Sequence, residues 1–116
     1  MAKNLDITCA KLGADLGAQS DDKTLTDALW VLEEQGVYAF FLFLAQKSER
    51  RRIFASCRTF LQEHFPDGLG SGNDVFKATQ AIATDVDKLL LARDLLRQSL
   101  IYARYHAKAG ASGRER

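Results

Sequence analysis

The chain has 116 residues, of which 47% are hydrophobic and 27% charged, and its formal net charge is +1. This length supports one hydrophobic core and excludes two ordinary domains, and the composition is that of a soluble globular protein. The single proline and the scarcity of Val, Ile and Thr runs favour helix over strand. We therefore expect an all-α fold, a single compact bundle of about five helices with a long C-terminal helix.

The near-zero net charge hides an asymmetry between the two parts of the chain. Residues 1–46 carry three lysines against seven carboxylates, a net charge of −4, and residues 47–116 carry 13 Lys or Arg against eight carboxylates, a net charge of +5. Such polarity suits a protein that touches a polyanion on one side, or one that stacks on copies of itself, acidic side to basic side.

Leu5, Cys9, Leu12 and Leu16 recur at helical spacing and predict a first helix of about three turns. Residues 1–13, MAKNLDITCAKLG, lack an apolar run of signal-peptide length, so we expect a cytoplasmic protein. Cys9 and Cys57 are too few for a disulfide framework, and neither has a His or Cys at zinc-ligand spacing.

A second helix is predicted from Thr24, which stands three residues before Asp27 in a capping pattern, to the stop at Gly36. The next segment, residues 37–45, reads VYAFFLFLA. Nine residues are about half of what a helix needs to cross a bilayer. A buried strand fits the composition, but we prefer a short buried helix, because no second strand signal offers a pairing partner.

Residues 46–65 predict a further helix with Ser48 as its cap, and its first turn carries Arg50, Arg51 and Arg52. Cations near a helix N-terminus oppose the macrodipole, at a cost of about 0.3–1 kcal/mol each. This local conflict indicates that the arginines are kept for a partner. A helix that runs unbroken from residue 37 would remove the conflict.

Residues 66–73 predict a loop rich in glycine, and residues 74–83 predict a short helix. The three glycines of the loop lack the Gly-Lys-Ser/Thr that a phosphate-binding loop requires, so we interpret the segment as a connector.

The longest predicted helix spans residues 85–109 and stops at Gly110. We expect residues 1–109 to form the single helical domain and residues 110–116 to be a flexible tail. One broad face of this helix is predicted to pack in the core: Ala92, Leu95, Leu96, Ser99, Tyr102 and Ala103.

A cationic stripe of four residues lies next to this packing face: Arg93, Arg97, Arg104 and Lys108. It falls within roughly 60° of the helix wheel and, with the basic cluster near residue 50, forms the candidate nucleic-acid-binding set. Solvated helix faces also carry such charges, so a surface without a partner is the alternative interpretation of either cluster alone. The candidate residues are Lys47, Arg50, Arg51, Arg52, Arg93, Arg97, Arg104 and Lys108.

No catalytic, cofactor or metal site is predicted. His64 and His106 lie on different helices without partners in the sequence, and capping or solvated positions explain them better than catalysis. Most aromatic residues, Trp30 and Tyr38 among them, are expected in the core. Tyr105 points away from the packing face, where it would stack on a base or contact a protein.

Two stretches resemble the small all-helical subunit of type III CRISPR–Cas effector complexes, most of all the Cmr-type one. Residues 28–47 resemble that family's helix, glycine break and second apolar helix, with Gln35 where the family usually has Asn. Residues 100–107, LIYARYHA, resemble its aromatic and arginine signature late in the last helix, with Tyr102 where Trp is common and Arg104 at the arginine.

The resemblance implies a non-catalytic subunit that stacks in copies along the effector and contacts the guide RNA and target backbone through a basic surface, with other subunits of the complex as partners. It implies a role in antiviral defence and no cofactor, metal or membrane. The alternative from the residues alone is a helical protein-interaction or oligomeric scaffold module that does not bind nucleic acid.

Overall fold

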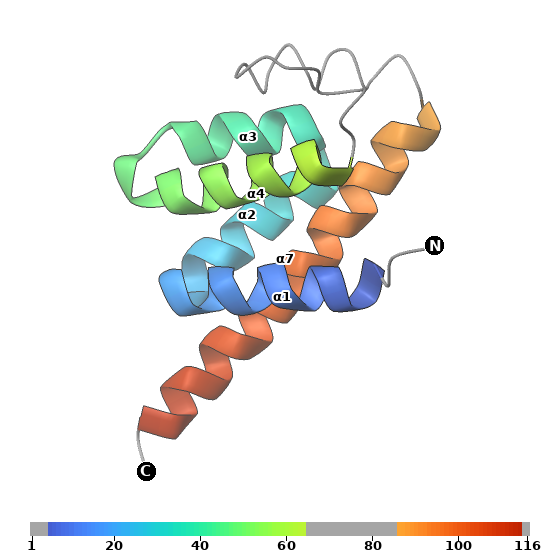
Figure 1. Cartoon of the computed structure of the whole chain (residues 1–116). Coiled ribbons are helices and arrows are strands. Elements are labelled where there is room, and N and C mark those ends of the chain that lie inside the picture. Colours follow the sequence, from blue (N-terminus) through green and yellow to red (C-terminus); the bar gives the residue numbers. More distant parts are fainter. Residues whose placement is uncertain (1–4, 65–85, 115–116) are drawn as a thin grey trace.

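The computed structural model describes residues 5–64 and 86–114, the latter with side chains to residue 109. These residues form helices and turns but no strand, which confirms the all-α prediction, and the helices pack into one bundle around a long final helix (Figure 1). In chain order the elements are α1 (Leu5–Gln19), α2 (Asp22–Gln35), α3 (Val37–Ala45), the 3₁₀-helix η1 (Ser48–Arg50), α4 (Arg51–His64) and α7 (Val86–Arg114).

Helix α2 begins earlier than the sequence predicted. Its N-cap is Asp21, whose Oδ1 accepts a hydrogen bond from the Thr24 backbone N–H at 3.2 Å. Hydrogen bonds from Thr24 lower the pKa of Asp21. The predicted cap, Thr24, therefore lies inside the first turn. The predicted stop is confirmed, because Gly36 has φ 97°, a left-handed value that favours glycine.

Helix α3 is the apolar centre of the molecule, as predicted for a short buried helix. Phe40, Phe41 and Leu44 are fully buried. The Phe41 ring packs edge-on against Phe40 and against Phe54 of α4, with ring centroids 5.3 and 5.4 Å apart. α3 and α4 run next to one another in Figure 1, where α2 lies behind them.

Residues 46–50 separate α3 from α4, so the two do not form one unbroken helix. Ser48 starts η1 rather than α4, and α4 begins at Arg51. Helix α4 therefore has Arg51 and Arg52 in its first turn with no carboxylate there. The local conflict with the helix dipole that the sequence predicted is present in the structure.

The core face predicted for the last helix is largely correct. The face buries Ala92, Leu95, Leu96, Ser99 and Ala103, while Tyr102 is half-buried. The predicted stop at Gly110 is wrong, because α7 continues to Arg114. Alanines flank the glycine on both sides, and a single helical glycine costs only about 1 kcal/mol relative to alanine.

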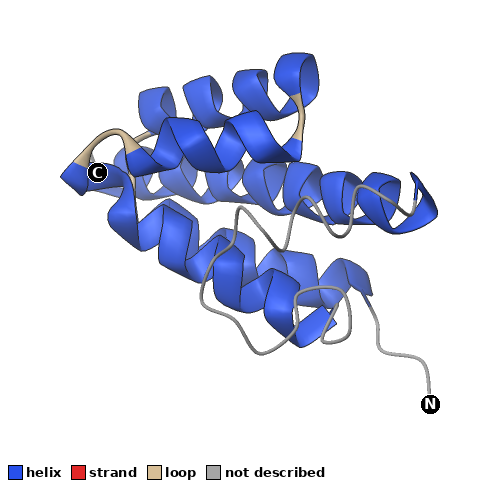
Figure 2. Ribbon diagram, turned by 90° about the horizontal axis from the view of Figure 1, so that it is seen from above, coloured by secondary structure: helices blue, strands red, loops and turns tan. Residues whose placement is uncertain are grey.

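Helices α1 and α7 pack against each other with their chains running in the same direction, and their backbones come very close. Cys9 lies against Leu95, with its Sγ 3.5 Å from the Leu95 carbonyl oxygen. One and two turns later, Gly13 lies against Ser99 and Tyr102, and Gly17 against Ala103 and His106. Small side chains at every fourth position of both helices permit this approach. Figure 1 shows α1 crossing in front of α7, and Figure 2 shows the helices of the bundle from above.

Some aromatic predictions were wrong. Trp30 is 58% exposed and Tyr38 39% exposed, because both point outward from α2 and α3. The predicted loop at 66–73 and the predicted helix at 74–83 lie outside the described residues.

Candidate nucleic-acid interface

Arg93 of α7 binds the C-terminal end of α2. Its Nη2 donates a hydrogen bond of 2.7 Å to the backbone carbonyl oxygen of Glu33. The last turn of α2 contains no basic residue, so its free carbonyl groups and the negative end of its dipole lack a cation from α2 itself. Arg93 supplies that cation from 60 residues further along the chain. Its guanidinium is therefore engaged inside the protein.

Arg97 and Arg104 form ion pairs with the two ends of α2. Arg97 Nε lies 2.6 Å from Glu33 Oε1, and Arg104 Nε lies 3.2 Å from Asp22 Oδ1. The pairs join positions of increasing number on α7 to positions of decreasing number on α2, so the two helices run antiparallel. The side chains are 49% and 38% exposed in the first pair, and 31% and 40% exposed in the second. Both pairs are open to water.

Arg50 is the inward-facing member of the arginine triplet. Its Nη1 donates a 2.9 Å hydrogen bond to the carbonyl oxygen of Phe43, and its guanidinium carbon lies 3.8 Å from the centre of the Phe43 ring. The last turn of α3, like that of α2, contains no basic residue. Arg50 therefore caps α3 and stacks on its aromatic side chain.

Lys47, Arg51 and Arg52 are exposed, and we call these three the basic corner. Lys47 is the N-cap of η1, and the two arginines form the first turn of α4. Within the described part of the chain, no ion pair or hydrogen bond engages their side chains. These cations are the members of the candidate set, together with Lys108 near the end of α7, that stay available to a partner.

The eight candidate residues therefore do not form one surface. Four arginines bind α2 or α3. The sequence analysis did not identify the two carboxylate residues that pair with the arginines of α7, Asp22 and Glu33. A signal for Glu33 was present: carboxylates in the last turn of a helix oppose its dipole, so Glu33 and Glu34 indicate a cation from elsewhere.

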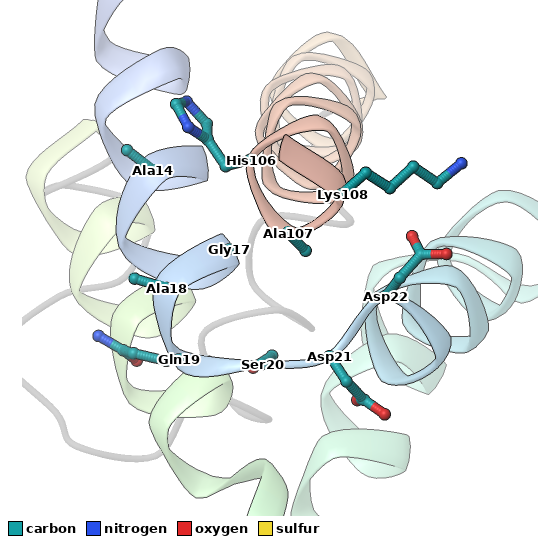
Figure 3. Close-up of a pocket in the computed structure, with 10 residues that line it drawn as sticks. All are labelled: Ala14, Gly17, Ala18, Gln19, Ser20, Asp21, Asp22, His106, Ala107 and Lys108. Atoms are coloured by element: carbon teal, nitrogen blue, oxygen red, sulfur yellow. The ribbon is translucent and has the colours of Figure 1, made fainter. Parts of the chain in front are cut away.

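A pocket of about 640 Å³ lies between the turn that joins α1 to α2 and the end of α7. In Figure 3, His106 and Lys108 point to opposite sides of this pocket, His106 toward α1 and Lys108 away from α1, on the side of α2. The carboxylate of Asp22 already binds Arg104. The pocket residues therefore do not converge on one point, as catalytic groups would.

Other reactive side chains are enclosed. Burial raises the pKa of the Cys57 thiol to about 12, and burial raises the pKa of Cys9. His64 Nδ1 lies 2.9 Å from the carbonyl oxygen of Phe60, one turn earlier in α4. Among the described residues, no group of three or more His, Cys, Asp or Glu side chains could hold a metal ion.

Comparison with family models, with curated proteins and with solved structures finds no match for this chain. The resemblance to type III small subunits therefore rests on its sequence patterns alone. No helix among the described residues is long and apolar enough to span a membrane.

Proposed function

We propose that this chain is a non-catalytic small subunit of a type III CRISPR–Cas effector complex, and that it contacts the backbone of the guide RNA and its target through the basic corner. The observation that carries the proposal is the exposure of Lys47, Arg51 and Arg52 without a partner in the described residues. Cations in the first turn of a helix lower its stability. Phosphates would offset that cost.

The chemistry of the corner suits contacts that do not depend on base sequence. A guanidinium presents several N–H donors in a plane and binds two phosphate oxygens at once, whereas a lysine supplies a point charge. Such contacts position a protein on a nucleic acid without reading bases. A subunit that lies along guides of any sequence needs this property.

The sequence resemblance supplies the proposed setting, which is the cytoplasm, with copies of this chain and other effector subunits as partners. The acidic first part of the chain supports a contact with basic partner surfaces, because four carboxylates and one lysine give α2 a net charge of −3. Because three arginines of the α7 stripe are engaged inside the protein, we place the proposed RNA contact at the basic corner rather than on the stripe.

A protein-interaction module without RNA binding is the second candidate. Two exposed aromatic side chains favour it, Trp30 at 58% and Tyr105 at 65% exposure. Large aromatic residues anchor many protein interfaces, and a buried partner surface would cover them. The two candidates differ in their response to salt.

RNA binding by the double variant Arg51→Glu and Arg52→Glu tests the proposal. Each phosphate contact adds about 0.7 to the slope of log affinity against log salt for a single strand, so the variant should lose about 1.4 of that slope. Lys11→Glu with Lys23→Glu is the matched control, because it changes the net charge equally at exposed positions outside the candidate binding set. Circular dichroism checks that both variants fold.

Suppose that the parent protein binds short single-stranded RNA and that both double variants lose the same amount of slope in log affinity against log salt. The corner would then not be the binding site. A parent that binds no RNA at low salt, alone or within its complex, would refute RNA binding and leave the protein-interaction module.

A further inference from the structure

The carboxylates that bind the α7 stripe occupy the same donors that a phosphate would use. A guanidinium donates to carboxylate and to phosphate oxygens through the same N–H groups. Glu33 holds Arg97 at 2.6 Å and Asp22 holds Arg104 at 3.2 Å. Each donor bound to α2 is thereby withheld from an external polyanion.

We propose that Asp22 and Glu33 are specificity-determining residues, internal phosphate mimics that keep Arg97 and Arg104 from RNA. The inference rests on the proposed function, because the RNA that is excluded from the α7 stripe is then confined to the basic corner. Without the two carboxylates, α7 would present a continuous cationic stripe beside α2, and RNA would bind a second surface.

Stability alone does not account for these pairs. Exposed ion pairs contribute about 0–1 kcal/mol, and both pairs here are open to water. Burial holds α7 on the rest of the bundle more strongly, through Leu96, Leu100 and Leu29. Arg93 adds its hydrogen bond to a backbone carbonyl group, which no substitution at Glu33 removes. The main effect of the two carboxylates is therefore on the surface charge.

The charge balance of the two surfaces differs in the way that this inference requires. Helix α2 has a net charge of −3, which nearly cancels the four cations of the stripe. Residues 47–52 contain four cations and a single carboxylate, Glu49, a net charge of +3. A polyanion is steered to the uncompensated surface, because long-range attraction follows the local net charge.

Amide substitutions test the inference with little disturbance of the fold, because Asn and Gln have the shape of Asp and Glu but no charge. The arginine is then no longer held by an ion pair. We expect Glu33→Gln to bind a short single-stranded RNA of mixed sequence with a salt slope about 0.7 steeper than the parent, and Asp22→Asn with Glu33→Gln to add about 1.4. For the double variant, the gain in affinity over the parent then grows about sevenfold when salt falls fourfold, from about 200 to about 50 mM.

Glu34→Gln is the matched control. Glu34 is exposed, adjacent to Glu33 on the same helix, and has no ion pair in the described part of the chain. The substitution makes the same change in net charge but frees no arginine, so its salt slope should equal that of the parent. Arg97→Ala with Arg104→Ala, placed in the double amide variant, should remove the whole gain.

Equal slopes for Glu33→Gln and Glu34→Gln, or a gain that survives removal of the two arginines, would overturn the inference whether or not the parent binds RNA. The corner variant Arg51→Glu with Arg52→Glu reports separately on the proposed function. A parent that fails to bind, beside a double amide variant that binds through Arg97 and Arg104, would refute the corner and leave the phosphate mimics standing.

Discussion

The stability of the variant Gly13→Ala tests how closely α1 approaches α7. An ideal Cβ at Gly13 would lie 2.5 Å from Tyr102 Cβ, 2.9 Å from the Ser99 carbonyl oxygen and 3.0 Å from the Ala103 backbone nitrogen. Two of these atoms belong to the backbone of α7 and the third is fixed to it. A rotamer change cannot relieve the overlap, so the helices must move apart.

Two effects of opposite sign set the magnitude. Alanine is favoured over glycine inside a helix by about 1 kcal/mol. Overpacking of a close contact costs about 1–3 kcal/mol and sometimes more, and separation of the helices also opens contacts near Cys9 and Leu95. We expect a net loss of about 1–2 kcal/mol in the free energy of unfolding, or a fall in Tm of roughly 4–8 °C for a domain of this size.

Urea unfolding followed by far-UV circular dichroism gives this free energy. Ala18→Gly is the control, because Ala18 is an exposed position of the same helix and reports the propensity term alone, with the opposite substitution. A Gly13→Ala protein that is more stable than the parent by about 1 kcal/mol would show only the propensity effect. That result would refute the close parallel packing of α1 on α7.

Three further predictions follow from buried and capping groups. Phe41→Asp should unfold or aggregate the protein, because it places a carboxylate at a fully buried position of α3, at a cost of several kcal/mol; a cooperative unfolding transition like that of the parent would contradict this burial. Arg93→Met should lower the free energy of unfolding by about 1–2 kcal/mol, because the Glu33 carbonyl group loses its donor; Lys11→Met, at an exposed position, should change it little. The free energy of unfolding should fall as the pH rises above about 9, because the Cys57 thiol ionises there in the unfolded chain but only near pH 12 when buried; titration of Cys57→Ala, which lacks the thiol, should remove this component.

The fold was predictable where one physical signal dominated. Residues 37–45 are almost wholly apolar and had no strand to pair with, so a buried helix was the best solution, and α3 is one. Gly36 marked the end of α2, because its backbone requires a conformation that other residues rarely adopt. The predicted end of α7 was wrong, because Gly110 was interpreted as a stop signal by itself, whereas its neighbours favour continuation of the helix.

The close packing of α1 on α7 was missed for a different reason. Gly13 and Gly17 were interpreted as weak points of the first helix, since glycine lowers helix propensity. Their second property, the absence of a Cβ, matters only against a partner, and the partner residues begin 86 residues away from Gly13, at Ser99. Local patterns of one helix do not specify which other helix it contacts. The exposure of Trp30 was missed for the same reason.

Some charged residues oppose the dipole of their own helix, and the fold compensates only some of them. This difference separates the cations that are engaged inside the protein from those that stay available to a partner. Glu33 and Glu34 in the last turn of α2, and Arg51 and Arg52 in the first turn of α4, each oppose the dipole of their own helix. The conflict in α2 is compensated inside the protein, because arginines of α7 bind both the carbonyl oxygen and the carboxylate of Glu33. In the described residues, no carboxylate pairs with the arginines of α4. A sequence retains such a charge at a cost when another molecule compensates it. This reasoning makes the basic corner, rather than the longer and more regular stripe on α7, the surface that we expect to bind an anionic partner.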